Sequence, residues 1–212
     1  VAQRAVSQII KREKVPVVIG GTGLYVQALL YGIFDDGARD EKLRCRLQLL
    51  AETKGLAFRY EKLMSVDSDA AHKIDPHDAK RIIRALEVYE KTQQPISVIQ
   101  KKRRGLVDQY RVLVIGLRRD RADLYERIER RVDFMVHAGL LDEVRRLMKR
   151  RLSRTAAYCI GVREMEGFLK GRTSFEEAVD VMKRNSRHFA KRQMTWFRKT
   201  QGIEWIDVGR NE

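Results

Sequence analysis

The sequence predicts an α/β protein with a helical insertion, and three observations support this fold class. Residues 15–19, VPVVI, form a short apolar run ended by glycines, which is typical of a parallel strand buried on both faces. Two further strands are predicted at residues 110–117 and 203–208. Residues from about 38 to 106 carry no strand pattern and read as helices. We therefore expect an α/β core formed by residues 1–37 and 107–212, with a helical insertion domain at residues 38–106.

The predicted sheet is small for this fold class. Three strands are too few for a doubly wound sheet, and the chain opens on what resembles the end of a helix. We expect an N-terminal part of the sheet domain to be absent from these residues.

Helix boundaries are marked by local signals. Asp75 followed by Pro76 predicts the start of a helix that ends at QQP, residues 93–95. Asp120 is expected to cap a helix that Gly139 ends, and a second helix follows through residue 147. Ser174 and Glu177 have the spacing of a capping box, which predicts a long helix reaching about residue 199.

The composition is strongly basic. Lys and Arg number 44 against 29 Asp and Glu, which gives a formal net charge of +15 and predicts a polyanionic partner. No run approaches the roughly 20 apolar residues that cross a bilayer. Cys45 and Cys159 lie far apart, which argues against a disulfide framework or a cysteine metal site. We expect a monomeric cytoplasmic protein without a membrane segment.

The most distinctive segment is residues 183–199, KRNSRHFAKRQMTWFRK, in which basic residues alternate with aromatic ones. On a helix, like charges three or four positions apart share a face and repel one another unless an anion lies there. These charges are Arg184, Arg187, Lys191 and Arg198. The alternative is a solvated charged face with an aromatic pair in the core. No acidic residue lies between Asp180 and Glu204, and this favours an RNA contact.

Three other segments are candidate anion sites. Residues 20–23, GGTG, could bring backbone amides close to a phosphate or a nucleotide, although a tight strand-to-helix turn explains them equally well. Lys80, Arg81 and Arg84 lie within one helical turn, where Glu87 could instead form a surface salt bridge. A third basic group follows the central strand, where α/β sheets place ligands, and consists of Arg127, Arg130 and Arg131. These arginines could hold a diphosphate, or they could instead form ion pairs with Glu126 and Glu129.

The histidines predict no metal site. His72 and His77 flank a helix start at which Asp75 and Asp78 already have a local explanation.

Five ordered blocks together resemble one family over nearly the whole chain: GGTGLYVQALLYG, DPHDAKRIIRALEVYEKTQQPIS, DLYERIERRVDFMVHAGLLDEV, IGVREMEGFLKG and KRNSRHFAKRQMTWFRK. This family is tRNA dimethylallyltransferase, also called tRNA isopentenyltransferase. The resemblance implies a P-loop-NTPase-like parallel sheet core with a helical insertion domain. It also implies transfer of a dimethylallyl group from dimethylallyl diphosphate to N6 of the adenine 3′-adjacent to the tRNA anticodon, after that base is flipped into a channel.

The resemblance further implies roles for individual residues. Thr22 would lie near the target adenine, and Arg131 would hold the diphosphate. The residues expected to contact the tRNA anticodon stem-loop are Arg44, Lys80, Arg81, Arg84, Tyr158, Arg163, Lys191, Arg192, Gln193, Thr195, Trp196 and Arg198. Mg²⁺ would act as a substrate-bound cofactor. Its ligands, the phosphate-binding loop and the general-base aspartate are expected in a part that precedes these residues.

Two alternatives remain open from the sequence. The chain could be an RNA-binding module without activity, because the catalytic N-terminal part is missing. It could also be an adenylate isopentenyltransferase, whose acceptor is a free adenine nucleotide. A small acceptor needs no basic surface that extends over several helices, which argues against the second alternative.

Overall fold

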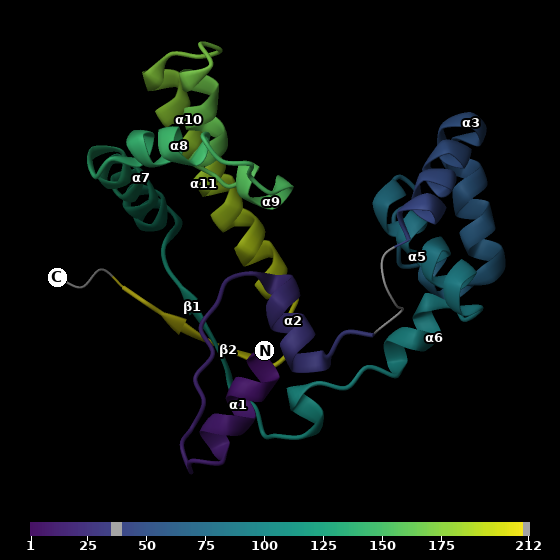
Figure 1. Cartoon of the computed structure of the whole chain (residues 1–212). Coiled ribbons are helices and arrows are strands. Elements are labelled where there is room, and N and C mark those ends of the chain that lie inside the picture. Colours follow the sequence, from purple (N-terminus) through teal and green to yellow (C-terminus); the bar gives the residue numbers. More distant parts are fainter. Residues whose placement is uncertain (35–39, 210–212) are drawn as a thin grey trace. The chain divides into compact units, whose positions relative to one another are not determined.

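The computed structural model describes residues 1–34 and 40–209, which form two compact units (Figure 1). The helical unit contains residues 1–20 and 24–112, and the sheet unit contains residues 21–23 and 113–212. The domain boundaries expected from the sequence, with an insertion at residues 38–106, stay a prediction.

The described residues of the helical unit form helices and connecting loops. Its helices are α1 (Ala2–Ile10), α2 (Gly23–Tyr31, whose first residue belongs to the sheet unit), α3 (Glu41–Val66), α4 (Ser68–Ala71), α5 (Ala79–Thr92) and α6 (Ile96–Lys101), followed by a 3₁₀ turn at Leu106–Asp108. Helix α3 contains a kink at Gly55, whose φ is 79°. The helical content predicted for this region is therefore confirmed over the described residues.

Helix α5 lies in the centre of the helical unit's core. Its residues Ile82, Leu86 and Val88 are buried, and Leu63 of α3 packs in the same cluster. The helix begins three residues later than predicted, because the side chain of Asp78, rather than Asp75, accepts a hydrogen bond from the backbone of the first turn. The Asp75 carboxylate instead accepts from the His77 backbone N–H at 2.8 Å. Such a local turn competes with helix formation.

The segments that flank α3 to α6 meet in close backbone contact. A Cβ atom on Gly32, where φ is 84°, would lie 2.7 Å from the carbonyl carbon of Arg104. A Cβ atom on Gly105 would lie 2.5 Å from the carbonyl carbon of Leu30. Glycine at both positions therefore allows the chain to leave and return side by side within this unit.

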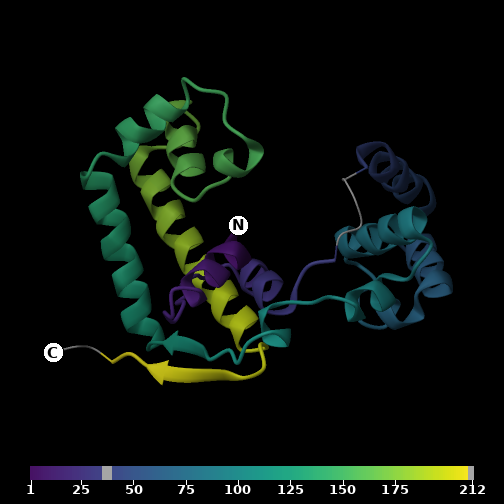
Figure 2. The same ribbon diagram turned by 60° about the horizontal axis from the view of Figure 1, so that its bottom comes forward.

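The sheet unit contains two parallel strands joined by helices. In chain order its elements are β1 (Val114–Arg118), α7 (Arg121–His137), α8 (Leu140–Leu147), α9 (Arg154–Ala157), α10 (Val162–Leu169), α11 (Phe175–Phe197) and β2 (Ile203–Asp207). Helices α7 and α11 run side by side (Figure 2). Arg118 and Asp207 are register partners, and the Arg118 guanidinium donates to both carboxylate oxygens at 2.6 and 2.7 Å, a pairing that agrees with that register.

The core of the sheet unit is built by four helices. Val132 of α7, Val144 of α8, Met165 of α10 and Met182 of α11 are buried in one cluster. Buried Glu164 adds a polar link, since its carboxylate accepts from the Gly161 backbone N–H at 2.7 Å and from Nδ2 of Asn185 at 2.8 Å. Helix α10 is thus capped and tied to α11 by one side chain.

The predicted parallel α/β character is confirmed, but one predicted strand is wrong. Residues 15–19 form no strand, and Val15 and Ile19 are 86% and 93% exposed. A strand needs a partner for its backbone hydrogen bonds, and no described segment pairs with this one. Strand β1 is paired with β2, but it is not buried on both faces, and Leu117 is 66% exposed.

The sequence predicts no membrane-spanning segment, and the lengths and apolar character of the helices can be compared with that prediction. Among the described residues, none of the helices combines the length and the apolar character that a bilayer span requires.

Candidate nucleic-acid interface

Helix α11 begins where the sequence predicts. The Glu177 backbone N–H donates to Oγ of Ser174 at 3.1 Å, and the Ser174 backbone N–H donates to the Glu177 carboxylate at 2.9 Å. This capping box satisfies two N–H groups that have no partner inside the helix. The N-terminal half of α11 then buries Ala178 and Met182. The helix is therefore anchored at one end by its cap and its core residues.

Acidic residues of α7 neutralise part of the basic face of α11. Lys183 Nζ lies 2.7 Å from a carboxylate oxygen of Asp133, and Arg187 forms an ion pair with Glu129. The Arg187 guanidinium also lies 6.0 Å from the centroid of the Tyr125 ring. The repulsion predicted along this face is thus relieved in the half of the helix that packs on α7.

The C-terminal half of α11 keeps its charge exposed. Within the described part of the chain, no acidic side chain pairs with Lys191, Arg192 or Arg198, and all three are exposed. Phe189 and Trp196 are 44% and 38% exposed, so the alternative that places these aromatic rings in the core is wrong. This half therefore offers cations beside half-exposed rings, the combination that binds phosphates and stacks on bases.

The turn at residues 21–23 rests on the same half of α11. Nε2 of Gln193 donates to the backbone carbonyl of Gly21 at 2.9 Å. The ring of Trp196 lies against Gly23. Thr22 between them is exposed. The hydroxyl of Thr195 donates to the Lys191 carbonyl at 2.9 Å, within its own helix.

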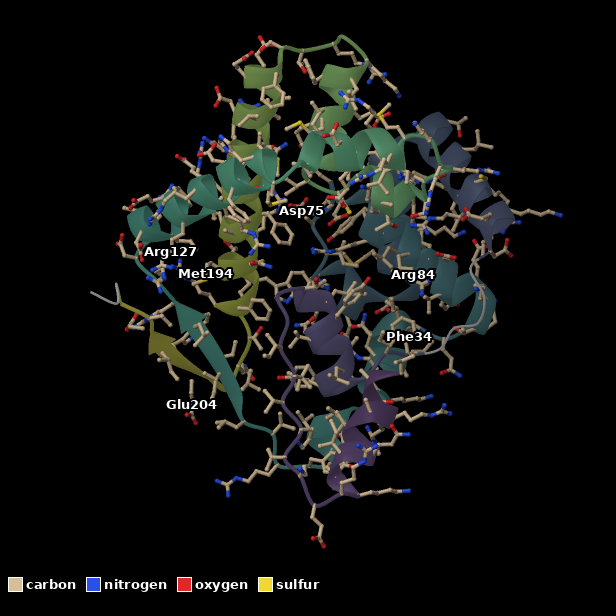
Figure 3. The ribbon with its side chains drawn as sticks, turned by 60° about the vertical axis from the view of Figure 1, so that its left-hand side comes forward. Phe34, Asp75, Arg84, Arg127, Met194 and Glu204 are labelled. Atoms are coloured by element: carbon tan, nitrogen blue, oxygen red, sulfur yellow. The ribbon has the colours of Figure 1, made fainter. Side chains whose placement is uncertain are left out.

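Helix α7 presents one unpaired arginine among the three predicted as diphosphate contacts. Asp120 caps the helix as predicted. Arg127 lies 3.3 Å from the Asp123 carboxylate, and Arg130 lies 3.5 Å from that of Glu126 (Arg127 is labelled in Figure 3). Arg131 is exposed, and no described carboxylate pairs with it. The alternative of local pairing therefore applies to its two neighbours.

The buried Asp123 carboxylate organises the N-terminus of α7. Arg119 donates to it and Arg127 adds a second ion pair. These two guanidinium groups, Arg119 above all, lower the pKa of Asp123 below its usual value.

Tyr158 and Arg163 lie together at the surface of the sheet unit. The Arg163 guanidinium is 5.7 Å from the centroid of the Tyr158 ring, and the tyrosine is 63% exposed. The two side chains thus form one cation–π pair between the end of α9, where Tyr158 lies, and the first turn of α10, which carries Arg163.

The predicted tRNA contacts of the helical unit differ in how they are held. Lys80 is exposed, and Arg81 lies 3.4 Å from the Asp78 carboxylate. Arg84 donates to Glu87 at 3.2 Å and lies over the Phe34 ring at 5.9 Å (Figure 3). Glu87 is fully buried, so the predicted surface salt bridge is instead anchored in the core.

The predicted residues fall into the two units. Arg44, at the start of α3, joins the three α5 residues in the helical unit, whereas the other ten lie in the sheet unit. Within the sheet unit, α11 brings its own residues beside Thr22. No contact among the described residues joins Thr22 to Arg131. The described residues also contain no group of three or more His, Cys, Asp or Glu side chains arranged to hold a metal ion.

The contacts that hold these residues have no local signal in the sequence, with one exception. The pair of Glu129 with Arg187 and the bond from Gln193 to Gly21 each join residues far apart in the chain, and no local pattern encodes them. The link from Glu164 to Gly161 could have been found, because a glycine followed three positions later by Glu has capping-box spacing.

The fold and the basic face together define an α/β protein whose solved counterparts are isopentenyl- and dimethylallyltransferases. The chain is 37% identical to the full-length tRNA isopentenylpyrophosphate transferase of Bacillus halodurans, with a TM-score of 0.64, covering 100% of this chain and 66% of that one. It is 26% identical to a eukaryotic dimethylallyltransferase acting on tRNA, with a TM-score of 0.76, covering 99% of this chain and 55% of that one. The predicted P-loop-NTPase-like fold with added helices is confirmed by these likenesses.

Residues 1–200 match the family model described as IPP transferase, and the chain belongs to this family. It is 42% identical over 211 residues to a tRNA dimethylallyltransferase of Carboxydothermus hydrogenoformans, covering 99% of this chain and 68% of the relative. It is 42% identical over 203 residues to that of Halothermothrix orenii, covering 94% of this chain and 62% of the relative. The chain thus spans about two thirds of the length of these relatives.

Proposed function

We propose that the protein transfers a dimethylallyl group from dimethylallyl diphosphate to N6 of the adenine 3′-adjacent to a tRNA anticodon. The observation that carries this proposal is family membership over residues 1–200, together with relatives that are named tRNA dimethylallyltransferases. The exposed cations on the C-terminal half of α11, which pair with no carboxylate in residues 1–34 and 40–209, support a polyanionic acceptor.

In this reaction the adenine N6 forms a bond to C1 of the dimethylallyl group while the bond from C1 to the diphosphate oxygen breaks. The electron pair leaves with the diphosphate, and the N6 proton passes to a base. Negative charge develops on the leaving oxygen, and a guanidinium stabilises it with two parallel hydrogen bonds. We assign this role to Arg131, because its neighbours Arg127 and Arg130 are already paired with carboxylates.

The RNA would be held by both units. In the sheet unit we assign phosphate contacts to Lys191, Arg192 and Arg198, and stacking contacts to Tyr158 and Trp196. In the helical unit the proposed contacts are Arg44, Lys80, Arg81 and Arg84. Extruding the target base from the anticodon loop would cost on the order of a few kcal/mol, and the binding free energy of these RNA contacts offsets that cost.

Mg²⁺ is proposed to enter bound to the diphosphate. The described residues contain no group of three or more His, Cys, Asp or Glu side chains that could hold the ion. The proposal also includes a monomeric state, in which one chain contacts one anticodon arm.

The test uses the full-length natural protein that carries this chain, with Mg²⁺ and labelled dimethylallyl diphosphate. Two acceptors are compared, an anticodon stem-loop with adenine at the target position and free adenosine monophosphate. We expect label in the stem-loop and none in the nucleotide. Label in the nucleotide alone would identify an adenylate isopentenyltransferase, and binding of the stem-loop without transfer would identify an RNA-binding module. Either result overturns the proposal.

A further inference from the structure

Two side chains on one face of α11 hold the turn that carries Thr22. Gln193 and Trp196 are three positions apart on the helix and therefore point the same way. The amide nitrogen of Gln193 is bonded to the Gly21 carbonyl at 2.9 Å, and the Trp196 ring covers Gly23. Both glycines belong to the same compact unit as α11.

The close approach of α11 explains why glycine occupies position 23, and at position 21 a side chain would displace the flexible end of Gln193 from its hydrogen bond. Neither residue has a positive φ, so conformational freedom is not the reason. A Cβ atom on Gly23 would lie 2.6 Å from Cε2 of Trp196, and nearer still to Cδ1 and Nε1. A Cβ atom on Gly21 would lie 3.3 Å from Cδ of Gln193 and would overlap its amide nitrogen. Around Gly20, by contrast, no atom lies within 4 Å of such a Cβ.

These contacts fix the backbone on both sides of Thr22. The hydrogen bond from Gln193 holds the backbone of Gly21, the residue before Thr22. The Trp196 ring packs on Gly23, the residue after it, and limits how far that backbone can move, because an indole ring is rigid. The Thr22 side chain itself stays exposed. We propose that Gln193 and Trp196 are positioning residues, which set where the Thr22 hydroxyl stands relative to the acceptor base. This role rests on the proposed function and goes beyond it, because it gives the two residues a task other than RNA binding.

The first test of this proposal measures the contact without measuring activity. Trp196 and Trp205 are the two tryptophans in these 212 residues. Replacing Trp205 by Phe therefore leaves Trp196 as the one tryptophan of this sequence whose fluorescence is measured. In that background Gly23→Ala should displace the ring and shift its emission maximum, whereas Gly20→Ala, with open space around its Cβ, should not. If Gly23→Ala left the emission maximum unchanged, the proposed contact between Trp196 and Gly23 would be wrong.

The second test separates positioning from RNA binding by steady-state kinetics of the full-length protein. Gln193→Ala should lower kcat on the order of 10- to 100-fold, while the KM for tRNA changes less than about twofold, because moving the Thr22 hydroxyl away from its place beside the acceptor base costs rate rather than binding. Gln193→Met, which keeps the length of the side chain and adds no charge but cannot donate to the carbonyl, should behave like Gln193→Ala. A raised KM with unchanged kcat would instead make Gln193 an RNA contact and overturn the proposal.

A double-mutant cycle guards against a general loss of stability. If Gly23 and Trp196 act through one contact, Gly23→Ala should lower kcat less in a Trp196→Ala background than in the natural protein. Additive losses in kcat would overturn the proposal. If the natural protein transfers no prenyl group at all, the proposed function fails, and the fluorescence test still decides whether α11 holds the turn.

Discussion

At the scale of single residues, the state of pairing decides what each basic side chain can do. Arg187 and Lys183 point toward α7 and are neutralised by its carboxylates, whereas Arg198 has none among the described residues. A paired cation loses its partner when it binds a phosphate. The unpaired cations are therefore the better candidates for RNA contacts.

Arg198→Ala should weaken tRNA binding and reduce its salt dependence. Each phosphate contact contributes about 0.7–0.9 to the slope of log affinity against log salt, so losing one contact lowers the slope by about one unit. Binding isotherms at several salt concentrations measure this slope. Arg145→Ala, which removes an arginine paired with Asp142 on α8, is the matched control. A slope that Arg198→Ala leaves unchanged would rule out a phosphate contact.

Arg131→Ala should weaken donor binding and spare tRNA affinity. The reason is that, of Arg127, Arg130 and Arg131, only Arg131 has no carboxylate partner among the described residues, so a diphosphate binds it without breaking an existing ion pair. Competition by inorganic diphosphate measures the effect, and we expect about a tenfold or greater loss, the equivalent of one charge-assisted hydrogen bond. Arg130→Ala serves as the control, since this side chain pairs with Glu126. If tRNA affinity fell and diphosphate affinity did not, the roles assigned here would be reversed.

Arg84→Ala should destabilise the helical unit, which makes it a poor probe of RNA binding. Glu87 is fully buried, and removing its arginine leaves a carboxylate without that partner. Leaving a buried charge without its partner costs on the order of 3 kcal/mol here, the lower end of the range for buried pairs, because the Arg84 side chain is 38% exposed. Urea unfolding measures the loss. Arg81→Ala, whose partner Asp78 lies near the surface, should change the free energy of unfolding by less than about 1 kcal/mol. Equal effects of the two substitutions would contradict this account.

At the scale of elements, helix ends follow from the sequence when the cap is local. Ser174 with Glu177 and Asp120 both cap the helices predicted for them. The sequence predicts that α5 starts at Asp75, because Asp-Pro is a common helix start, but two aspartates compete there and Asp78 caps the helix. A local pattern cannot decide between two such caps.

The buried Asp123 gives α7 a pH-dependent anchor. Arg119 and Arg127 lower its pKa in the folded protein, so its contribution to stability is present above the unfolded pKa, about 3.9, and is lost as the pH falls through the folded value. Asp123→Asn should lower the melting temperature at pH 7, and the difference from the natural protein should shrink below about pH 4. Thermal melts across this pH range measure the difference. Asp142→Asn, at an exposed pair on α8, should show a much smaller difference at pH 7. A difference that stays constant from pH 7 to pH 3 would exclude this linkage.

At the scale of the whole chain, the fold class was predictable and the strand content was not. Parallel α/β character follows from apolar runs separated by helices, and residues 114–118 and 203–207 confirm it. Residues 15–19 have the same apolar pattern but remain unpaired, because strand formation depends on a neighbour rather than on the segment itself. The candidate site likewise has one part that the local sequence predicts and one part that depends on distant segments. Its residues could be chosen from the sequence, whereas the contacts that orient them join distant segments.

The central claim is that the chain belongs to an enzyme that prenylates one adenine of a tRNA. The most direct measurement is mass spectrometry of nuclease-digested anticodon stem-loops after incubation with the full-length protein, Mg²⁺ and dimethylallyl diphosphate. We predict a mass increase of one dimethylallyl group on the adenosine that follows the anticodon, and none in a stem-loop with guanosine at that position. Unmodified adenosine at that position, or modification of another base, would contradict the claim.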